Sequence, residues 1–442
     1  MAIPARPTHR GLRRSPETLP RLITPALHEA AARLLDDILG GPGAADARMD
    51  RFFRAQPRLG PKDRGVIAET VYGSLRHHRL LCAFAQTAEP RRVVAAWLAA
   101  FEGYNARQLQ ALGVAHPEAL VAAARSDRDI YPFAVSASLP DWLAARLATL
   151  LPASEHGAAA TALLAPAPLD IRTNTLKTDR AALQQSLART GHDLSPTPLS
   201  PWGLRRAARA GLFRTPEFAA GHFEVQDEGS QLIAPLLEPR RGERIVDYCA
   251  GAGGKTLHLS ALLANSGMLY AFDTSQKRLG RLRERATRAG CDNIRIQTLE
   301  TGPDNRLKRL YGKIDRVLVD APCSGTGTVR RSPDIKWRLA EERVTELAGQ
   351  ARAILTQAAR LVRPGGRLLY VTCSVLREEN EDVIADFLAE HGGDYTPIDT
   401  HGVLTRRGIP LSAQAIDAGP SLRLWPHRHG TDGFFAQILQ RG

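Results

Sequence analysis

Asp247-Tyr248-Cys249-Ala250-Gly251-Ala252-Gly253-Gly254-Lys255-Thr256 is the stretch that decides the fold of this chain. It predicts a strand that enters a glycine-rich turn and continues as a helix. The glycines of such a turn let the backbone approach a ligand closely. A phosphate-binding loop would need glycine in place of Cys249, and a dinucleotide-binding turn would need it in place of Thr256. The turn therefore matches neither of these nucleotide-binding patterns.

A carboxylate at the end of the next predicted strand points to a different ligand. Asp273 is the last residue of that strand, where it can accept hydrogen bonds from both hydroxyls of a ribose. S-adenosylmethionine has a ribose but no phosphate, so the turn and Asp273 together predict a pocket for this cofactor, which leaves as S-adenosyl-L-homocysteine. Taken alone, Asp273 could instead be the N-cap of the following helix, beside Thr274 and Ser275.

Strands and helices alternate through the C-terminal part of the chain. Strands are predicted at residues 244–248, 268–273, 294–299, 316–320 and 367–372, and helices from Thr256, at 275–289 and from Glu341. This alternation is typical of an α/β doubly wound, Rossmann-like parallel sheet with helices on both faces. Ligands of such sheets bind beyond the carboxyl ends of the strands.

Two cysteines follow neighbouring strands of this predicted sheet. Asp320-Ala321-Pro322-Cys323-Ser324-Gly325 ends one strand, and Thr372-Cys373-Ser374 ends another. We therefore expect two thiols and one carboxylate beside the cofactor. A cysteine is more often an inert apolar residue, and that interpretation suits Cys82 and Cys291. No CxxC pair is present, so no metal site is predicted.

Cytosine methylation at carbon 5 would use both thiols. A thiolate that adds to carbon 6 turns the ring into an enamine, whose carbon 5 can attack the sulfonium methyl group. Asp320 could hold the ring nitrogen N3 during this addition, and a second thiol could assist the later release of the enzyme. Cationic neighbours such as Lys255 would favour thiolates by lowering the thiol pKa. Position and chemistry leave open which thiol attacks.

The ordered motifs closely resemble the Sun/Nop (RsmB/Fmu-like) family of S-adenosylmethionine-dependent RNA cytosine-C5 methyltransferases. The matching segments are Cys249 to Lys255, Asp273, Asp320 to Gly325, Arg331-Ser332-Pro333-Asp334-Ile335-Lys336-Trp337, Thr372-Cys373-Ser374, Glu378-Glu379-Asn380-Glu381 and Asp432-Gly433-Phe434-Phe435. The resemblance covers roughly residues 170 to 442.

This resemblance implies roles for individual residues. Cys373 is expected to be the nucleophile and Cys323 the thiol that assists release, and Asp320 is the third catalytic residue that the chemistry above predicts. The cofactor pocket is expected to contain Cys249, Ala250, Gly251, Ala252, Gly253, Gly254, Lys255, Asp273, Glu300 and Asp320. Two positions depart from the family pattern: Ala252 stands where many members have proline, and Glu300 matches an aspartate of the third strand only loosely.

The chain divides into four predicted parts. Residues 1–22 read as a basic disordered arm, residues 23–150 as an all-α domain, residues 165–235 as a small α+β segment and residues 236–442 as the catalytic domain. Lys62-Asp63-Arg64 and the stretch from Val71 to Arg76 resemble the NusB-like domain of bacterial 16S rRNA members. This resemblance implies that the helical domain grips RNA, together with Arg172 and Asn174 of the small segment.

Composition agrees with a phosphate-rich partner. The 442 residues contain 59 Lys and Arg against 46 Asp and Glu, a formal charge of +13. Five sparse cysteines fit a reducing cytoplasm, and no uncharged apolar run is long enough for a membrane. We expect a cytoplasmic monomer that needs no metal and acts on RNA, most simply 16S rRNA. The alternatives are the same chemistry on tRNA, or a catalytically silent RNA-binding ribosome assembly factor.

Overall fold

The computed structural model describes residues 23–127, 130–206, 211–300, 302, 304–409, 411 and 419–442. The predicted basic arm, residues 1–22, lies outside the described residues. The chain forms two compact units. The first comprises Met1–Leu164 with Ser332–Arg338, and the second comprises Ala165–Arg331 with Leu339–Gly442.

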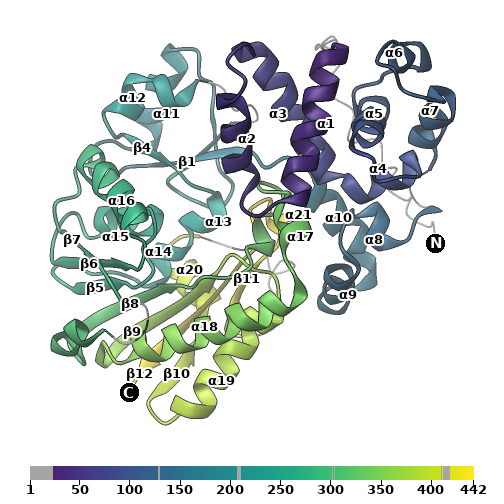
Figure 1. Ribbon diagram of the computed structural model, residues 1–442. Coiled ribbons are helices and arrows are strands. Elements are labelled where there is room, and N and C mark those ends of the chain that lie inside the picture. The colour runs from purple at the N-terminus through teal and green to yellow at the C-terminus, as the bar shows by residue number, and fades with distance from the viewer. Residues whose placement is uncertain are drawn as a thin grey trace, which may run out of the picture. The chain divides into compact units, whose positions relative to one another are not determined.

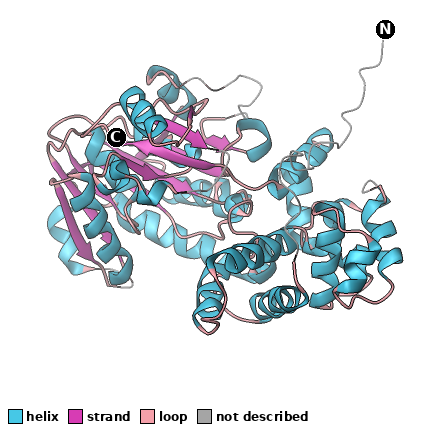
Figure 2. Ribbon diagram, turned by 90° about the horizontal axis from the view of Figure 1, so that it is seen from above, coloured by secondary structure: helices cyan, strands magenta, loops and turns pink. Residues whose placement is uncertain are grey.

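The first unit is helical, as the apolar periodicity of its sequence predicts (Figure 2). Its helices are α1 Pro25–Gly40, α2 Ala45–Arg54, α3 Pro61–Arg76, α4 His78–Ala85, α5 Pro90–Phe101, α6 Ala106–Ala111, α7 Pro117–Arg125, α8 Phe133–Ser136, α9 Asp141–Leu150, α10 His156–Leu164 and α17 Ile335–Arg338. In α1 the Thr24 hydroxyl caps the first turn, and Leu34, Leu35 and Ile38 face the core. His77 separates α3 from α4.

A distant piece of chain completes this helical unit. Lys336 Nζ donates a hydrogen bond to the Arg76 carbonyl at 2.7 Å, and Trp337 Nε1 donates to the Leu75 carbonyl at 2.6 Å. These carbonyls belong to the last turn of α3, where helix carbonyls lack partners within the helix. Lys336 is only 2% exposed, and its burial lowers its pKa well below the usual value. The segment Ser332–Arg338 therefore closes the end of α3.

The second unit begins with a small antiparallel sheet in the order β2-β3-β1-β4. Its elements are β1 Leu169–Thr173, α11 Arg180–Arg189, β2 Ser195–Pro196, β3 Gly203–Arg206, α12 Pro216–Ala219 and β4 Phe223–Val225. The expectation that Arg172 and Asn174 grip RNA is wrong, because both side chains are buried. Arg172 Nε donates to Gln226 Oε1 at 2.7 Å, and Asn174 Nδ2 donates to the carbonyls of Gly221 and Ala289.

The large sheet of this unit has the order β10-β12-β9-β8-β5-β6-β7, and β11 pairs with β12. Its strands are β5 Arg244–Asp247, β6 Met268–Asp273, β7 Ile294–Thr298, β8 Ile314–Asp320, β9 Val362–Thr372, β10 Tyr395–Ile398, β11 Leu422–Leu424 and β12 Phe434–Arg441. The five strands from β5 to β9 are parallel, as predicted. The three remaining strands pair antiparallel at the β9 edge, so the sheet is mixed.

Helices pack on both faces of the large sheet (Figure 1). They are α13 Glu228–Gln231, α14 Ile233–Leu236, α15 Gly254–Leu262, α16 Gln276–Ala289, α18 Glu341–Ala359, α19 Glu381–His391, α20 Thr400–Arg406 and α21 Pro426–His429. Alternate residues of β8 face opposite layers. Val317 packs in the core that contains Leu355 of α18, whereas Leu318 packs in the core that contains Leu259 of α15. The predicted Rossmann-like, doubly wound architecture is therefore confirmed.

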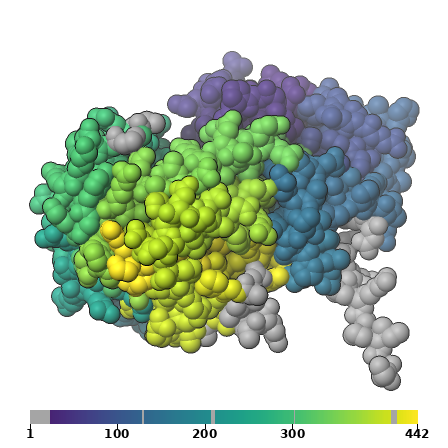
Figure 3. All heavy atoms as spheres, turned by 90° about the horizontal axis from the view of Figure 1, so that it is seen from below, coloured from purple at the N-terminus to yellow at the C-terminus, as the bar shows by residue number. Residues whose placement is uncertain are grey.

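The helix α19 lies on the outer surface of this unit, as its yellow-green residues show in Figure 3.

Among the helices of the described residues, none combines the length and the apolar character that a membrane crossing needs.

Candidate active site

The predicted site residues meet where the parallel strands end. Asp247, Asp273 and Asp320 are the last residues of β5, β6 and β8, and Cys373 directly follows β9. These strands are neighbours in the order β9-β8-β5-β6, so their carboxyl ends lie along one edge of the sheet. The topology therefore brings the acids, the glycine turn and both thiols to a common edge.

The glycine turn needs its glycines for two different reasons. Gly253 has a φ of +87°, and a Cβ at this position would lie 2.1 Å from Leu282 Cδ1. Gly251 has a φ of +55°, and a Cβ there would meet nothing within 4 Å. The backbone of Gly251 therefore borders open space, in which a ligand could approach it closely.

Asp273 holds the turn in place. Its carboxylate accepts hydrogen bonds from the backbone N–H of Gly251 at 2.9 Å and of Ser275 at 2.7 Å. The N-cap of α16 is Ser275, whose hydroxyl accepts from the Arg278 N–H. Asp273 is therefore not the helix cap, and it remains beside the glycine turn as the residue expected to bind the ribose.

Asp247 contributes an unsatisfied acceptor to the same edge. Its Oδ2 accepts from the Thr256 hydroxyl at 2.7 Å, whereas the buried Oδ1 has no partner among the described residues. Burial raises the pKa of this carboxyl to about 7. An open glycine turn, a strand-end carboxylate and an orphaned acceptor fit a ligand with ribose hydroxyls and an ammonium group, as S-adenosylmethionine has.

Lys255 and Asp320 form an ion pair beside the thiols, with 2.6 Å between Lys255 Nζ and Asp320 Oδ2. Burial by itself lowers the pKa of Lys255, but the Asp320 carboxylate outweighs it and the net shift is upward. The ammonium is therefore charged, and it also lies 5.4 Å from the centre of the Phe434 ring. This pairing of Lys255 with an acid was not evident from the sequence.

The two predicted thiols are in contact, with 3.5 Å between Cys323 Sγ and Cys373 Sγ. Both side chains are partly exposed. The hydrogen bond with Cys373 raises the pKa of Cys323, and burial raises it further. The expectation that both thiols have a depressed pKa is therefore wrong for Cys323, which is held as a protonated thiol.

Sequence reasoning missed the polar cluster that joins the two thiol loops. The loop after β8 contributes Ser324 and Thr326, and the loop after β9 contributes Ser374 and Glu379. Thr326 Oγ1 lies 3.0 Å from Ser374 Oγ, and Glu379 accepts hydrogen bonds from both the backbone and the hydroxyl of Ser324. Glu379 belongs to a family motif, but only the folded chain shows what it contacts.

Among the described residues, Glu300 has no contact with the other predicted site residues. It follows β7, it is exposed, and its backbone N–H donates to Asp304 Oδ2 at 3.3 Å. Asp304 is itself buried and paired with Arg306. Its placement in the cofactor pocket stays a prediction.

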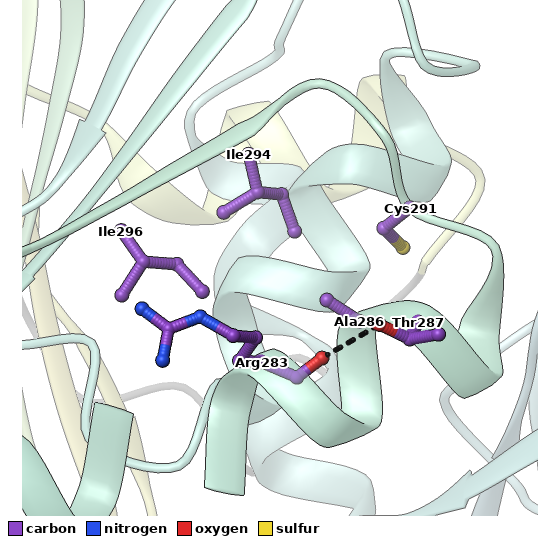
Figure 4. Close-up of a pocket in the computed structure, with 6 residues that line it drawn as sticks. All are labelled: Arg283, Ala286, Thr287, Cys291, Ile294 and Ile296. Carbon is purple, nitrogen blue, oxygen red and sulfur yellow. Dashed lines mark hydrogen bonds between the residues drawn. The ribbon is translucent and has the colours of Figure 1, made fainter. Parts of the chain in front are cut away.

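A hollow of about 340 Å³ lies elsewhere in the same unit (Figure 4). It is lined by Arg283, Ala286, Thr287, Cys291, Ile294 and Ile296. Ile294 is the first residue of β7, whereas the cofactor edge is at the last residues of the strands. The hollow contains no predicted site residue. Within the described ranges, no group of three or more His, Cys, Asp or Glu side chains is arranged to hold a metal ion.

A mixed sheet whose five parallel strands carry a glycine turn after β5, an acid at the end of β6 and two thiols at neighbouring strand ends defines a Rossmann-like, S-adenosylmethionine-dependent methyltransferase. Comparison with known proteins identifies the group to which it belongs. The family model for the 16S rRNA methyltransferase RsmB/F matches residues 234–440, and the model for the ferredoxin-like domain of the RsmF/B-like methyltransferases matches residues 139–209.

Individual relatives cover long stretches of the chain. The chain is 30% identical to a probable ribosomal RNA small subunit methyltransferase B of Synechocystis, over 93% of this chain and 99% of that protein. It is 33% identical to the human 28S rRNA (cytosine(4447)-C(5))-methyltransferase, over 68% of this chain and 38% of that protein. The crystal structure of the protein PH0851 superposes with a TM-score of 0.74 at 26% identity, covering 94% of this chain and 99% of that one.

This chain belongs to the RsmB/F family of 16S rRNA methyltransferases. The predicted family, enzyme class and cofactor are therefore confirmed.

Proposed function

We propose that this protein transfers a methyl group from S-adenosylmethionine to carbon 5 of a cytosine in 16S rRNA, through a covalent bond between Cys373 and carbon 6. The observation that carries the proposal is the contact of two thiols at adjacent strand ends, beside the ion pair of Lys255 with Asp320. The names of the relatives support rRNA and cytosine as the targets. The protein is proposed to act as a cytoplasmic monomer.

Each site residue has a role in this reaction. S-adenosylmethionine supplies the methyl group when it is bound at the glycine turn. Cys373 adds to carbon 6 of the base, and the charged Lys255 interacts electrostatically with this residue. Asp320 shares a proton with the ring nitrogen N3, which must gain a proton or hydrogen bond during the addition, and its ion pair with Lys255 keeps it in place. Asp273 and the turn from Cys249 to Lys255 bind the cofactor.

The cytosine must be unpaired or flipped out of its stack, because carbon 6 cannot be reached inside a helix. We propose that the NusB-like helical domain, residues 23–150, and the small segment, residues 165–235, help to bind the RNA. The exposed face of α16 is a further candidate contact. Among the described residues, no carboxylate forms an ion pair with Lys277, Arg281 or Arg283 of this helix, and all three are exposed.

Neutralising two of these cations should weaken RNA binding and its dependence on salt. For Arg281→Gln with Arg283→Gln, the slope of log affinity against log salt should become shallower by about 1.5, because each arginine releases counterions from one phosphate. The measurement is a fluorescence-anisotropy titration of a labelled rRNA fragment at several salt concentrations. The matched control changes two exposed arginines of α18 that already have carboxylate partners, Arg343 and Arg352. An equal effect of both pairs would contradict a contact at α16.

The function is tested with purified protein, labelled S-adenosylmethionine and total RNA from a strain that lacks the gene. The expected result is label in 16S rRNA as 5-methylcytosine, and bisulfite sequencing should locate the site. Label in tRNA with unlabelled rRNA would replace the rRNA assignment. No transfer to any RNA would favour the silent assembly factor.

A further inference from the structure

Glu379 joins the two loops that carry the thiols. Its Oε1 accepts from the Ser324 backbone N–H at 2.6 Å, and its Oε2 accepts from the Ser324 hydroxyl at 2.5 Å. The same carboxylate is hydrogen-bonded to the Ser374 side chain. Ser324 directly follows Cys323, and Ser374 directly follows Cys373. One buried carboxylate therefore fixes the residue after each thiol.

The position of Glu379 is itself fixed by the fold. The residue is 1% exposed, and its carbonyl accepts a hydrogen bond from the Tyr370 hydroxyl at 2.6 Å. The next residue, Asn380, hydrogen-bonds through its side chain to Thr372 and to the Ser374 carbonyl. The carboxylate consequently has little freedom to turn away from the two loops.

Each thiol has a different ionisable neighbour, and burial raises the pKa of one of these neighbours, Glu379, above its usual value. Lys255 interacts electrostatically with Cys373, whereas Glu379 interacts with Cys323 and raises the pKa of that thiol beyond the effects of its hydrogen bond with Cys373 and of burial. The titratable groups around Cys323 are Cys373 from the loop after β9, Tyr370 from β9, Glu379, and the Lys255–Asp320 pair across the site.

We propose that Glu379 is a positioning residue that keeps Cys323 protonated, so that the Cys323 thiol donates a hydrogen bond to the Cys373 thiolate. This inference rests on the proposed function. In the release step, the carbon-5 proton leaves to water, the bond between carbon 6 and the Cys373 sulfur breaks, and its electron pair stays on that sulfur. Cys323 keeps its own proton and stabilises the departing thiolate.

The first test measures thiol protonation without RNA or cofactor. The pH dependence of iodoacetamide labelling is followed by mass spectrometry at each cysteine of the full chain. In the unmodified protein, the midpoint for Cys323 should lie above the value of about 8.5 for a free thiol. In Glu379→Gln, labelling of Cys323 below its midpoint should become at least about threefold faster, because a nearby negative charge is lost.

Two control variants separate charge from structure. Ser324→Ala removes a hydrogen bond of Glu379 but keeps its carboxylate, so Cys323 labelling should change less than in Glu379→Gln. Asp382→Asn removes a carboxylate that pairs with the exposed Arg377 and should also change nothing. A midpoint for Cys323 at or below that of a free thiol overturns the proposal, even if Glu379→Gln does not fold. An equal shift in Ser324→Ala and Glu379→Gln also overturns it.

The second test follows release. With RNA and cofactor, Glu379→Gln should lower kcat, leave KM for RNA unchanged and increase the fraction of protein–RNA adduct on denaturing gels. If Glu379→Gln shifts the labelling of Cys323 but leaves both kcat and the fraction of protein–RNA adduct unchanged, Glu379 has no role in release. Absence of methyl transfer in the unmodified protein would instead reject the proposed function, and the labelling result would stand on its own.

Discussion

Cys373→Ala should lower methyl transfer more than about a thousandfold, because it removes the atom that bonds to carbon 6 and no other thiolate can take its place. Binding of S-adenosyl-L-homocysteine, measured by calorimetry, should change little, since Asp273 holds the glycine turn through the backbone N–H groups of Gly251 and Ser275. The assay is transfer of a labelled methyl group to rRNA under single-turnover conditions.

A matched control for this variant is Cys82→Ala. Cys82 is a partly exposed thiol on α4 of the helical unit, and burial raises its pKa. Its loss should leave the rate within about twofold of the unmodified protein. Transfer at a normal rate by Cys373→Ala would show that the covalent route through Cys373 does not operate.

Cys323→Ala should stop turnover at a different point, with the RNA still bound covalently to Cys373. Cys323 lies 3.5 Å from the attacking sulfur, so its loss leaves the departing thiolate without a hydrogen-bond partner. The adduct should accumulate to nearly one per enzyme and survive a denaturing gel, whereas the unmodified protein should show only traces. Multiple-turnover transfer should fall about a hundredfold or more.

The pair of variants also distinguishes the two thiols. The double variant Cys323→Ala with Cys373→Ala should form no adduct. If Cys373→Ala formed an adduct and Cys323→Ala did not, the roles of the two thiols would be the reverse of those proposed.

Much of the site was predictable because its parts are short and local. The run from Asp247 to Thr256 encodes a strand, a turn and a helix in ten consecutive positions, and β6 has the predicted bounds Met268–Asp273. The alternation of strands and helices then indicates parallel strands, whose carboxyl ends lie at one edge of the sheet. The meeting of Asp320, Cys323 and Cys373 follows from these rules.

The remainder depends on contacts between distant residues. Nothing near Glu379 in the sequence indicates that it binds Ser324, which lies 55 positions earlier. The family resemblance implied that Arg172 and Asn174 grip RNA, yet both side chains hydrogen-bond to buried partners. Successive side chains of a strand point to opposite faces of the sheet, so the polarity of Arg172 alone does not show which way its side chain points.

The segment Ser332–Arg338 has a practical consequence for anyone who wishes to divide this protein. A fragment that ends at Leu164 would lack Lys336 and Trp337, and the last carbonyls of α3 would lose both donors. A fragment that begins at Ala165 would carry the same two side chains without the helix they close. Neither half of the polypeptide is thus a self-sufficient module, and a helical fragment would need a peptide spanning residues 332–338 added in trans to regain its full stability.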